Sequence, residues 1–333
     1  MADSLRARGA TVEFIGSESG IESRLAPEAG FHIHRLPLTG LAGNPLARAK
    51  ALTLFAHAVF TCKRIIQNFE PGAVLGVGGY ASAPAVISAR ALKVPTFLHE
   101  QNSVPGRVNR FASRFTKEVL VTFPAARESL RGATWVGMPT RKEYFEADKE
   151  AALRELGLDP PVVLIFGGSG GALKINLAAA EAFRDSMKYT VVQIAGRRDF
   201  PKLSTENPRH RILEYVDDIW RYVAAADVVV IRSGAGSLFD TAAAGRPAIL
   251  IPFPFATGDH QLHNARYFTE KAAAELMPDS EVDAHNLRER IENLLNDTQR
   301  REELAERMKS LATPGAADAV AERLLAASKE ETR

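Results

Sequence analysis

Short apolar runs that end in glycine-rich turns recur along this sequence, and they constrain its fold more than any other feature. The clearest runs are TVEFIG (11–16), AVLGVGG (73–79), TFLHE (96–100), VVLIFGGSGG (162–171), TVVQIAG (190–196), DVVVIRSGAG (227–236) and AILIPFP (248–254). Runs that do not alternate with polar residues are typical of strands buried on both faces of a parallel sheet. Helical patterns such as 177–187 and 237–245 separate them. The alternation predicts an α/β, doubly wound fold.

A chain of 333 residues is long enough for two domains. A charged stretch with prolines at 139, 160 and 161 interrupts the pattern, and a new series of strands starts at Val162. We place the boundary near residue 140. The last part of the chain, 287–329, predicts two charged helices separated by Pro314-Gly315.

Composition excludes several classes of protein. The chain has 42 Lys plus Arg against 40 Asp plus Glu, so it is not a broadly polycationic nucleic-acid binder. No run approaches the roughly 18 apolar residues that a membrane span needs. The single cysteine, Cys62, excludes an intrachain disulfide and a cysteine-based metal cluster. The first residues lack the apolar core of a signal peptide, so we expect a cytoplasmic protein.

Three glycine loops follow predicted strands and precede predicted helices: Gly76–Tyr80, Gly167–Gly171 and Ser233–Ser237. Such loops present backbone N–H groups and a helix N-terminus, an arrangement that binds phosphate. Three of them in two domains predict a bound diphosphate, although each alone is also compatible with a tight turn. The dinucleotide-like G-x-G-x-x-A at Gly76 is discounted because Pro84 falls early in its helix. No P-loop, H-E-x-x-H or D-x-D occurs, so we expect no metal ligands and no cofactor.

Polar clusters end two further strands. His99-Glu100-Gln101-Asn102 offers an imidazole and a carboxylate that could act as a base or hold sugar hydroxyls; the alternative is a capping network for a helix at 106–115. The amides and imidazoles of 258–264 suit a polyhydroxyl ligand, or simply start a polar helix. Arg141 and Arg232 lie near strand ends, where they could meet an anion or form ordinary ion pairs.

The segment 46–69 predicts a basic amphipathic helix. Its apolar positions are Leu52, Phe55, Val59, Cys62 and Ile66, and its nearby cations are Lys50, Lys63 and Arg64. Residues 1–140 carry a net charge of +7, whereas residues 141–333 carry −5. The helix could rest on an anionic membrane, but burial against the sheet is the commoner arrangement.

The motifs GVGGYASAP (76–84), HEQNSVPGRVNR (99–110), GGSGGALKIN (167–176), RSGAGSLFDTAAAGRPAILIPFP (232–254) and DHQLHNA (259–265) together resemble the MurG family of N-acetylglucosaminyltransferases. The resemblance spans nearly the whole chain. It implies a GT-B fold, with two Rossmann-like domains facing across a cleft. The acceptor and membrane-associated domain would be 1–140 plus the final helix 316–333, and the UDP-sugar domain would be 141–315.

The resemblance also implies the reaction. An inverting hexosyltransferase would move N-acetylglucosamine from UDP-N-acetylglucosamine to the 4-hydroxyl of undecaprenyl-diphosphate-linked N-acetylmuramyl-pentapeptide, in peptidoglycan synthesis. No cofactor, metal or nucleic acid is implied. The enzyme would be peripheral on the cytoplasmic face of the membrane, and other wall-synthesis proteins are potential partners. The alternatives are a related UDP-sugar:lipid glycosyltransferase and an inactive remnant that still binds UDP-sugar.

The residues that the resemblance assigns fall in three groups. Donor contacts would come from Asn102, Arg141, Ser169, Ile219, Ala235, Gly236, Ser237, Leu238, Phe239, Asp240 and Gln261. Acceptor contacts would come from Gly78, Gly79 and Tyr80. His99 and Glu100 are the candidate catalytic base.

The sequence departs from the family in three ways. Asp240 stands where glutamate is usual, and Met138 replaces an asparagine. The family also opens with a strand and a GGTGGH-like loop, which nothing here matches; residues 2–8 instead read as the end of a helix that stops at Gly9. A missing central strand would leave two neighbouring strands unpaired.

Overall fold

In the computed structural model, which describes residues 1–38, 45–168 and 171–331, the chain divides into two compact units. Unit 1 comprises Met1–Gly137 and Gly315–Arg333, and unit 2 comprises Met138–Pro314. Each buried hydrophobic cluster of the described residues lies within one unit. The two units therefore have separate cores.

Unit 1 contains two parallel sheets rather than one. Its strands are β1 (Glu13–Ser17), β2 (His32–Leu36), β3 (Val74–Gly76), β4 (Thr96–Glu100), β5 (Glu118–Val121) and β6 (Ala133–Trp135). β1 pairs with β2, and the other four form a sheet in the order β3-β4-β5-β6. Among the described residues, β1, β2, β3 and β6 each have a partner on one side alone. The expected pair of unpaired neighbouring strands therefore stays a prediction, since each sheet has two such edges.

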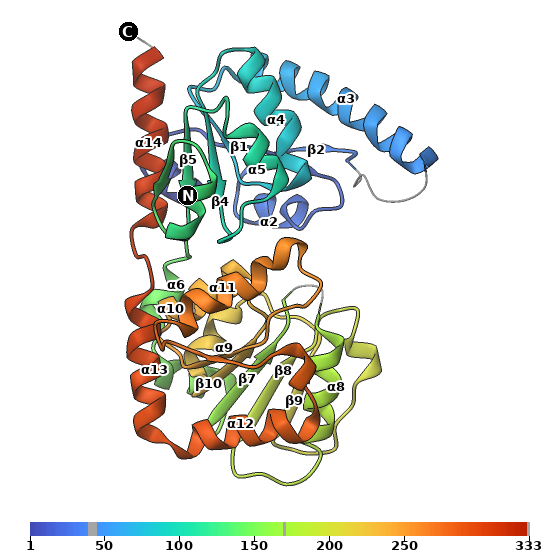
Figure 1. Cartoon of the computed structure of the whole chain (residues 1–333), viewed down its shortest axis with the longest axis vertical. Helices are drawn as coiled ribbons and strands as arrows, with labels where there is room; N and C mark the ends of the chain where they lie inside the picture. Colours follow the sequence, from blue (N-terminus) through green and yellow to red (C-terminus); the bar gives the residue numbers. More distant parts are fainter. Residues whose placement is uncertain (39–44, 169–170, 332–333) are drawn as a thin grey trace. The chain divides into compact units, whose positions relative to one another are not determined.

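Helices cover the sheets of unit 1 (Figure 1). They are α1 (Ala2–Ala7), α2 (Glu22–Glu28), α3 (Pro45–Phe69), α4 (Gly79–Ala91), α5 (Arg107–Ala112) and α14 (Ala316–Glu331), with a 3₁₀ turn η1 at Pro124–Ser129. α14 packs against α1 and joins the first core through Val320, Leu324 and Ala327. The expected helix at the start of the chain is confirmed: α1 ends before Gly9, whose φ of +81° glycine adopts readily.

Unit 2 is a doubly wound domain around one six-stranded parallel sheet. Its strands are β7 (Val162–Phe166), β8 (Thr190–Ile194), β9 (His210–Leu213), β10 (Val228–Ile231), β11 (Ala248–Leu250) and β12 (Glu275–Leu276), in the order β12-β11-β10-β7-β8-β9. Every residue of β7, β8 and β10 is buried. The non-alternating apolar runs thus have the predicted cause, burial on both faces.

The helices of unit 2 are α6 (Glu143–Glu146), α7 (Lys149–Leu156), α8 (Leu173–Ala182), α9 (Ile219–Ala225), α10 (Ala235–Ala243), α11 (His260–Thr269), α12 (Ala284–Asn296) and α13 (Thr298–Ser310). Short 3₁₀ turns η2, η3 and η4 occur at Phe200–Lys202, Thr257–Asp259 and Asp279–Glu281. The predicted break at Pro314-Gly315 is confirmed, but the prediction of a single helix before it is wrong, because α12 and α13 are separate. Asp297 interrupts them: its carboxylate accepts a hydrogen bond from the Arg300 N–H at 2.9 Å and caps α13.

α3 is the longest described helix, and its pattern of burial differs from the predicted one. Cys62 and Ile66 are buried as expected, but Leu52 is 59% exposed. The buried side of the helix uses the small residues Ala51 and Ala58 instead. Within the described part of the chain, no helix has both the length and the apolar character that spanning a membrane requires.

Candidate functional site

The strand order of unit 2 reverses between β7 and β10. From β7 the chain builds outward through β8 and β9, and it then returns to place β10, β11 and β12 on the other side. Phe166 pairs with Ile231, so the two glycine loops that follow these strands lie side by side at the carboxyl edge of the sheet. Open α/β sheets bind their ligands at such a reversal, because the two loops diverge and leave a crevice.

The first loop connects β7 to α8 through Gly167–Gly171, of which Ser169 and Gly170 lie outside the described residues. Gly171 has a φ of +77°, and a Cβ atom there would stand 2.6 Å from both the Ala195 carbonyl oxygen and Asp199 Oδ2. Asp199 is fully buried, and the hydrogen bond from Arg198 holds the pKa of its carboxyl below the usual value. Among the described residues, α8 has no side-chain cap, which leaves its first N–H groups without a side-chain acceptor there.

The second loop, Ser233-Gly234, leads from β10 into α10. A Cβ atom built on Gly234 meets no atom within 4 Å, so the backbone here faces open space. Asn264 of α11 is fully buried and donates from Nδ2 to the Ser233 carbonyl oxygen at 3.2 Å, which fixes the loop. Sequence reasoning singled out the segment around Asn264 but missed this supporting role.

The donor residues predicted along α10 separate into two kinds. Ala235, Gly236 and Ser237 form the uncapped first turn, where backbone N–H groups are free of intrahelical partners. Leu238 and Phe239 have buried side chains that belong to the core. These two residues can therefore contribute to a ligand site through their backbone alone.

Arg141, Tyr144 and Asp240 are brought together beside α10. Arg141 Nη2 donates to the Tyr144 hydroxyl oxygen at 3.5 Å, and its guanidinium lies 5.4 Å from the centre of the Tyr144 ring. Burial raises the pKa of Asp240 to about 7, although Arg141 and the hydroxyl of Tyr144 both favour its ionised form. Burial also raises the pKa of Tyr144. Sequence reasoning missed Tyr144, because no motif marks it in the charged stretch between the domains.

The other predicted donor residues of unit 2 lie at the same edge of the sheet. Ile219 is the first residue of α9, half-buried. Gln261, in the first turn of α11, accepts the Phe253 N–H with Oε1 at 3.0 Å. Arg232 forms an ion pair with Asp279 at 2.6 Å and donates to the Pro252 carbonyl oxygen at 3.1 Å. For Arg232 these contacts favour the ion-pair alternative over anion binding.

In unit 1, Glu100 organises the loop after β4. Its Oε1 accepts the Asn102 N–H at 2.9 Å, and its Oε2 accepts the Gly106 N–H at 3.0 Å and Asn109 Nδ2 at 2.8 Å. These contacts favour the capping alternative that the sequence left open, because Glu100 holds Gly106, the residue directly before the helix Arg107–Ala112. The preceding His99 is 1% exposed, and burial lowers its pKa to about 4.

The predicted acceptor residues lie next to this loop, because β3 and β4 are neighbours. Gly78 and Gly79 have φ values of +85° and +74°, and they bring the chain into α4 without a side-chain cap. A Cβ atom on Gly78 would lie 3.2 Å from Asn109 Nδ2. Tyr80 contacts α3: its hydroxyl donates to the Ala51 carbonyl oxygen at 3.3 Å. Gly78 therefore faces the Glu100 network through Asn109, a Cβ atom on Gly79 would meet nothing within 4 Å, and Tyr80 joins α4 to α3.

Comparison with known proteins gives consistent matches over both units. The N-terminal domain pattern of glycosyltransferase family 28 matches residues 1–121, and the C-terminal domain pattern of that family matches residues 162–322. A protein of Rubrobacter xylanophilus named UDP-N-acetylglucosamine–N-acetylmuramyl-(pentapeptide) pyrophosphoryl-undecaprenol N-acetylglucosamine transferase is 65% identical over 100% of both chains. A protein of Halothermothrix orenii with the same name is 34% identical over 95% of this chain and 91% of its own length.

Solved structures of glycosyltransferases are similar in fold to this chain. The crystal structure of MurG from Acinetobacter baumannii matches with a TM-score of 0.73 and 27% identity, covering 97% of this chain and 93% of that one. The calicheamicin glycosyltransferase CalG4 matches with a TM-score of 0.69 at 16% identity, covering 98% and 94%. The second likeness is one of fold alone. Together these structures confirm the expected α/β fold of the GT-B class.

Proposed function

The chain belongs to the family of UDP-N-acetylglucosamine–N-acetylmuramyl-(pentapeptide) pyrophosphoryl-undecaprenol N-acetylglucosamine transferases, and from this membership we infer its reaction. It is a glycosyltransferase of peptidoglycan synthesis. It moves N-acetylglucosamine from UDP-N-acetylglucosamine to the 4-hydroxyl of the undecaprenyl-diphosphate-linked N-acetylmuramyl-pentapeptide, with inversion at the anomeric carbon.

We propose that the donor diphosphate binds at the strand-order reversal of unit 2. The observation that carries this proposal is the pair of adjacent glycine loops, each leading into a helix without a side-chain cap. The free N–H groups and the positive ends of two helix dipoles both favour a diphosphate there. The open space at Gly234 allows a phosphate to approach the backbone closely. Ser169, outside the described residues, belongs to the first of these loops.

The remaining donor contacts follow from the groups around that crevice. Asp240 would accept the two hydroxyls of the ribose as an ionised carboxylate. Arg141 would offset the negative charge that develops on the departing diphosphate. Gln261 has its Oε1 engaged by the Phe253 N–H, which orients the amide nitrogen as a donor toward a sugar hydroxyl. Ile219 would meet the uracil through its backbone. The donor contact assigned to Asn102 stays a prediction.

For the acceptor we propose the glycine loop Gly78-Gly79, with Tyr80 supporting it through α3. His99 and Glu100 stay predictions as the catalytic base. Their contacts support a positioning role. His99 is buried and its pKa of about 4 makes it a weak base, and the Glu100 carboxylate is held by backbone and amide donors.

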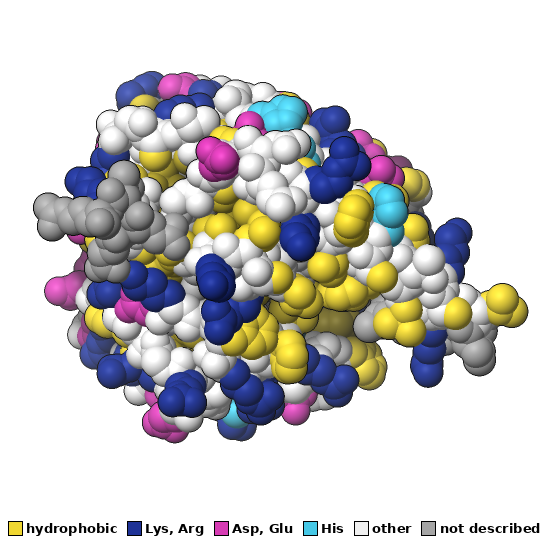
Figure 2. All heavy atoms as spheres, turned by 90° about the horizontal axis from the view of Figure 1, so that it is seen from above, with side chains coloured by type: hydrophobic (Ala, Val, Ile, Leu, Met, Phe, Trp, Pro, Cys, Tyr) yellow, Lys and Arg dark blue, Asp and Glu magenta, His cyan; other side chains and the backbone are white. Residues whose placement is uncertain are grey.

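We also propose that unit 1 rests on the cytoplasmic face of the membrane. α3 exposes Leu46, Leu52 and Phe60, which are 83%, 59% and 63% exposed. Lys50, Lys63 and Arg64 are exposed on the same helix. Figure 2 shows hydrophobic side chains gathered among lysine and arginine side chains on this face of the molecule. Apolar side chains and cations together favour an anionic lipid surface. Association with other wall-synthesis proteins stays a prediction.

Calorimetric titration with UDP-N-acetylglucosamine, UDP-glucose and UDP tests the donor assignment. We expect selective binding of the first, and at least tenfold weaker binding, about 1.4 kcal/mol, to a Gly234→Ala variant. The added methyl group meets no protein atom within 4 Å, so the variant should unfold at the wild-type temperature. Equal affinity of both chains would place the diphosphate elsewhere.

Acceptor trials separate the alternatives. Transfer of radiolabelled N-acetylglucosamine to the undecaprenyl-diphosphate acceptor, and not to diacylglycerol, would support the assigned reaction. Transfer to diacylglycerol would favour a related UDP-sugar:lipid glycosyltransferase. Donor binding without transfer to either lipid would favour an inactive remnant.

A further inference from the structure

The two-stranded sheet of unit 1 gathers three side chains of the kinds that bind metal ions, and none of them is a predicted donor or acceptor contact. Glu13 of β1 lies directly opposite His32 of β2, and His34 follows two residues later. Successive residues of a strand point to opposite faces, so His32 and His34 share a face, and Glu13 shares it through the register. The same face is buried further along by Ile15 and Leu36, so this trio occupies its open end.

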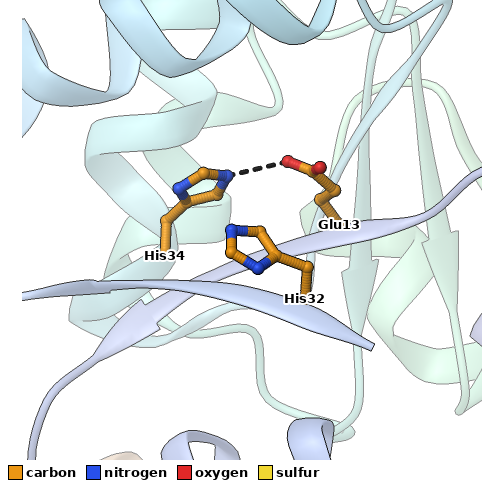
Figure 3. A group of neighbouring side chains, drawn as sticks. All are labelled: Glu13, His32 and His34. Carbon is orange, nitrogen blue, oxygen red and sulfur yellow. Dashed lines mark hydrogen bonds and ion pairs between the residues drawn. The ribbon is translucent and has the colours of Figure 1, made fainter. Parts of the chain in front are cut away.

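The three side chains converge on one another (Figure 3). His34 Nε2 lies 2.7 Å from Glu13 Oε2, and the rings of His32 and His34 meet edge to face with their centres 4.6 Å apart. One ligand atom from each residue lies within 4.8 Å of the other two. In the described part of the chain, no other group of three His, Cys, Asp or Glu side chains meets this condition.

This donor set has a definite chemical preference. Two imidazoles and one carboxylate suit Zn²⁺, whose Zn–N and Zn–O bonds are about 2.0–2.1 Å in tetrahedral sites. Ligand atoms of such a tetrahedron stand about 3.3 Å apart, so each separation in the trio must change by about 1.5 Å or less. We propose that Glu13, His32 and His34 form a zinc site, with the fourth position left to water.

The position of the site suggests what the ion does. A two-stranded sheet is marginally stable by itself, and among the described residues β1 pairs with β2 alone. A zinc ion held by Glu13 on one strand and by both histidines on the other would tie the strands together. The proposed role is therefore structural, and it is independent of the sugar-transfer chemistry. The alternative is a hydrogen-bonded Glu13–His34 pair that needs no metal.

Zinc titration of the untagged, chelator-treated full chain tests the proposal. We expect one Zn²⁺ per chain by calorimetry, and binding to His32→Gln/His34→Gln at least about 100-fold weaker, since even outer partners of metal ligands contribute about 10–100-fold. His285→Gln is the matched control, because His285 is 87% exposed and lies in unit 2. Equal binding by the wild type and the double variant would overturn the site, as would no binding by the wild type.

A second variant keeps the test decisive if the double histidine variant does not fold. Glu13→Gln keeps a polar partner for His34 but removes the anionic ligand, and we expect Zn²⁺ binding at least about tenfold weaker with an unchanged circular dichroism spectrum.

Cu²⁺ substitution supplies an independent readout: electron paramagnetic resonance should show nitrogen ligands that the double histidine variant lacks. A Cu²⁺ spectrum that is the same in the double variant would contradict the assignment. Zn²⁺ should also raise the unfolding temperature of the wild type more than that of either variant at the same Zn²⁺ concentration.

Discussion

Asp240 is the ionisable residue of the proposed donor site whose charge changes near neutral pH. Its pKa of about 7 in the folded chain exceeds its ordinary value because burial penalises the carboxylate. Between about pH 4 and pH 7 the folded chain keeps a proton that the unfolded chain releases. The free energy of unfolding therefore falls as the pH rises through this window, and the cost is complete above about pH 7.

Replacing Asp240 by Asn should remove this pH dependence. Relative to the variant, the wild type should lose a few kcal/mol of stability between pH 5 and pH 8, measured by urea unfolding.

The same ionisation should strengthen binding of UDP-N-acetylglucosamine as the pH rises through about 7, because the ribose hydroxyls donate to the carboxylate. Asp240→Asn should bind weakly at every pH, whereas the exposed control Asp185→Asn should behave as wild type. Parallel pH profiles for Asp240→Asn and the wild type would refute this assignment.

Single residues also mark where sequence reasoning ends. The motifs identified Arg141 and Asp240, but nothing in the sequence indicated that Tyr144 stands between them, because that contact depends on how α6 packs against α10. Likewise the sequence places Asn264 in a segment that suits a polyhydroxyl ligand, whereas its side chain donates to the Ser233 carbonyl oxygen and holds that loop in place. A motif specifies which residues meet a ligand, while the residues that support them are set by tertiary packing.

At the scale of elements, burial decided which predictions succeeded. The strands β7, β8 and β10 were predictable because burial on both faces imposes an unbroken apolar run. The break between α12 and α13 was missed because the polar pattern continues through it; the cap-forming sequence Asn296-Asp297-Thr298 was the available signal. The division of the unit 1 strands into two sheets follows from pairing, which no local pattern encodes.

The prediction at the scale of elements concerns the binding of α3 to anionic membranes. Lys63→Gln/Arg64→Gln should weaken binding to anionic vesicles by about 30-fold, because each cation near such a surface contributes about 1 kcal/mol. Binding should also fall with added salt, and Leu52→Ser/Phe60→Ser should reduce it at every salt concentration. Lys188→Gln/Lys202→Gln removes two exposed cations of unit 2 and serves as the control. Vesicle co-sedimentation measures all four chains, and unchanged binding by both α3 variants would exclude α3 as the membrane contact.

For the whole molecule, the two separate cores imply two unfolding steps. Unit 2 has one continuous six-stranded sheet with four fully buried strands, whereas unit 1 divides its strands between two sheets. Strands paired on one side and a two-stranded sheet are both sources of weakness. Unit 1 should therefore unfold at a lower denaturant concentration than unit 2.

The two tryptophans allow each step to be followed separately. Trp135 lies in unit 1, where its Nε1 donates to the Thr122 carbonyl oxygen at 2.9 Å, and Trp220 lies in unit 2 beside Ile219. In Trp220→Phe the remaining fluorescence reports unit 1, and in Trp135→Phe it reports unit 2. We expect the unit 1 transition first in urea. UDP-N-acetylglucosamine should move the unit 2 transition alone to higher urea, because a ligand stabilises the state that binds it.

The same pair of variants tests whether the donor binds to unit 2. A shift of the unit 1 transition alone would contradict the assignment of the donor to unit 2. If neither transition moved at donor concentrations far above the calorimetric Kd, the assignment of the donor to the β7–β10 reversal would fail, since tight binding to a folded site must stabilise it.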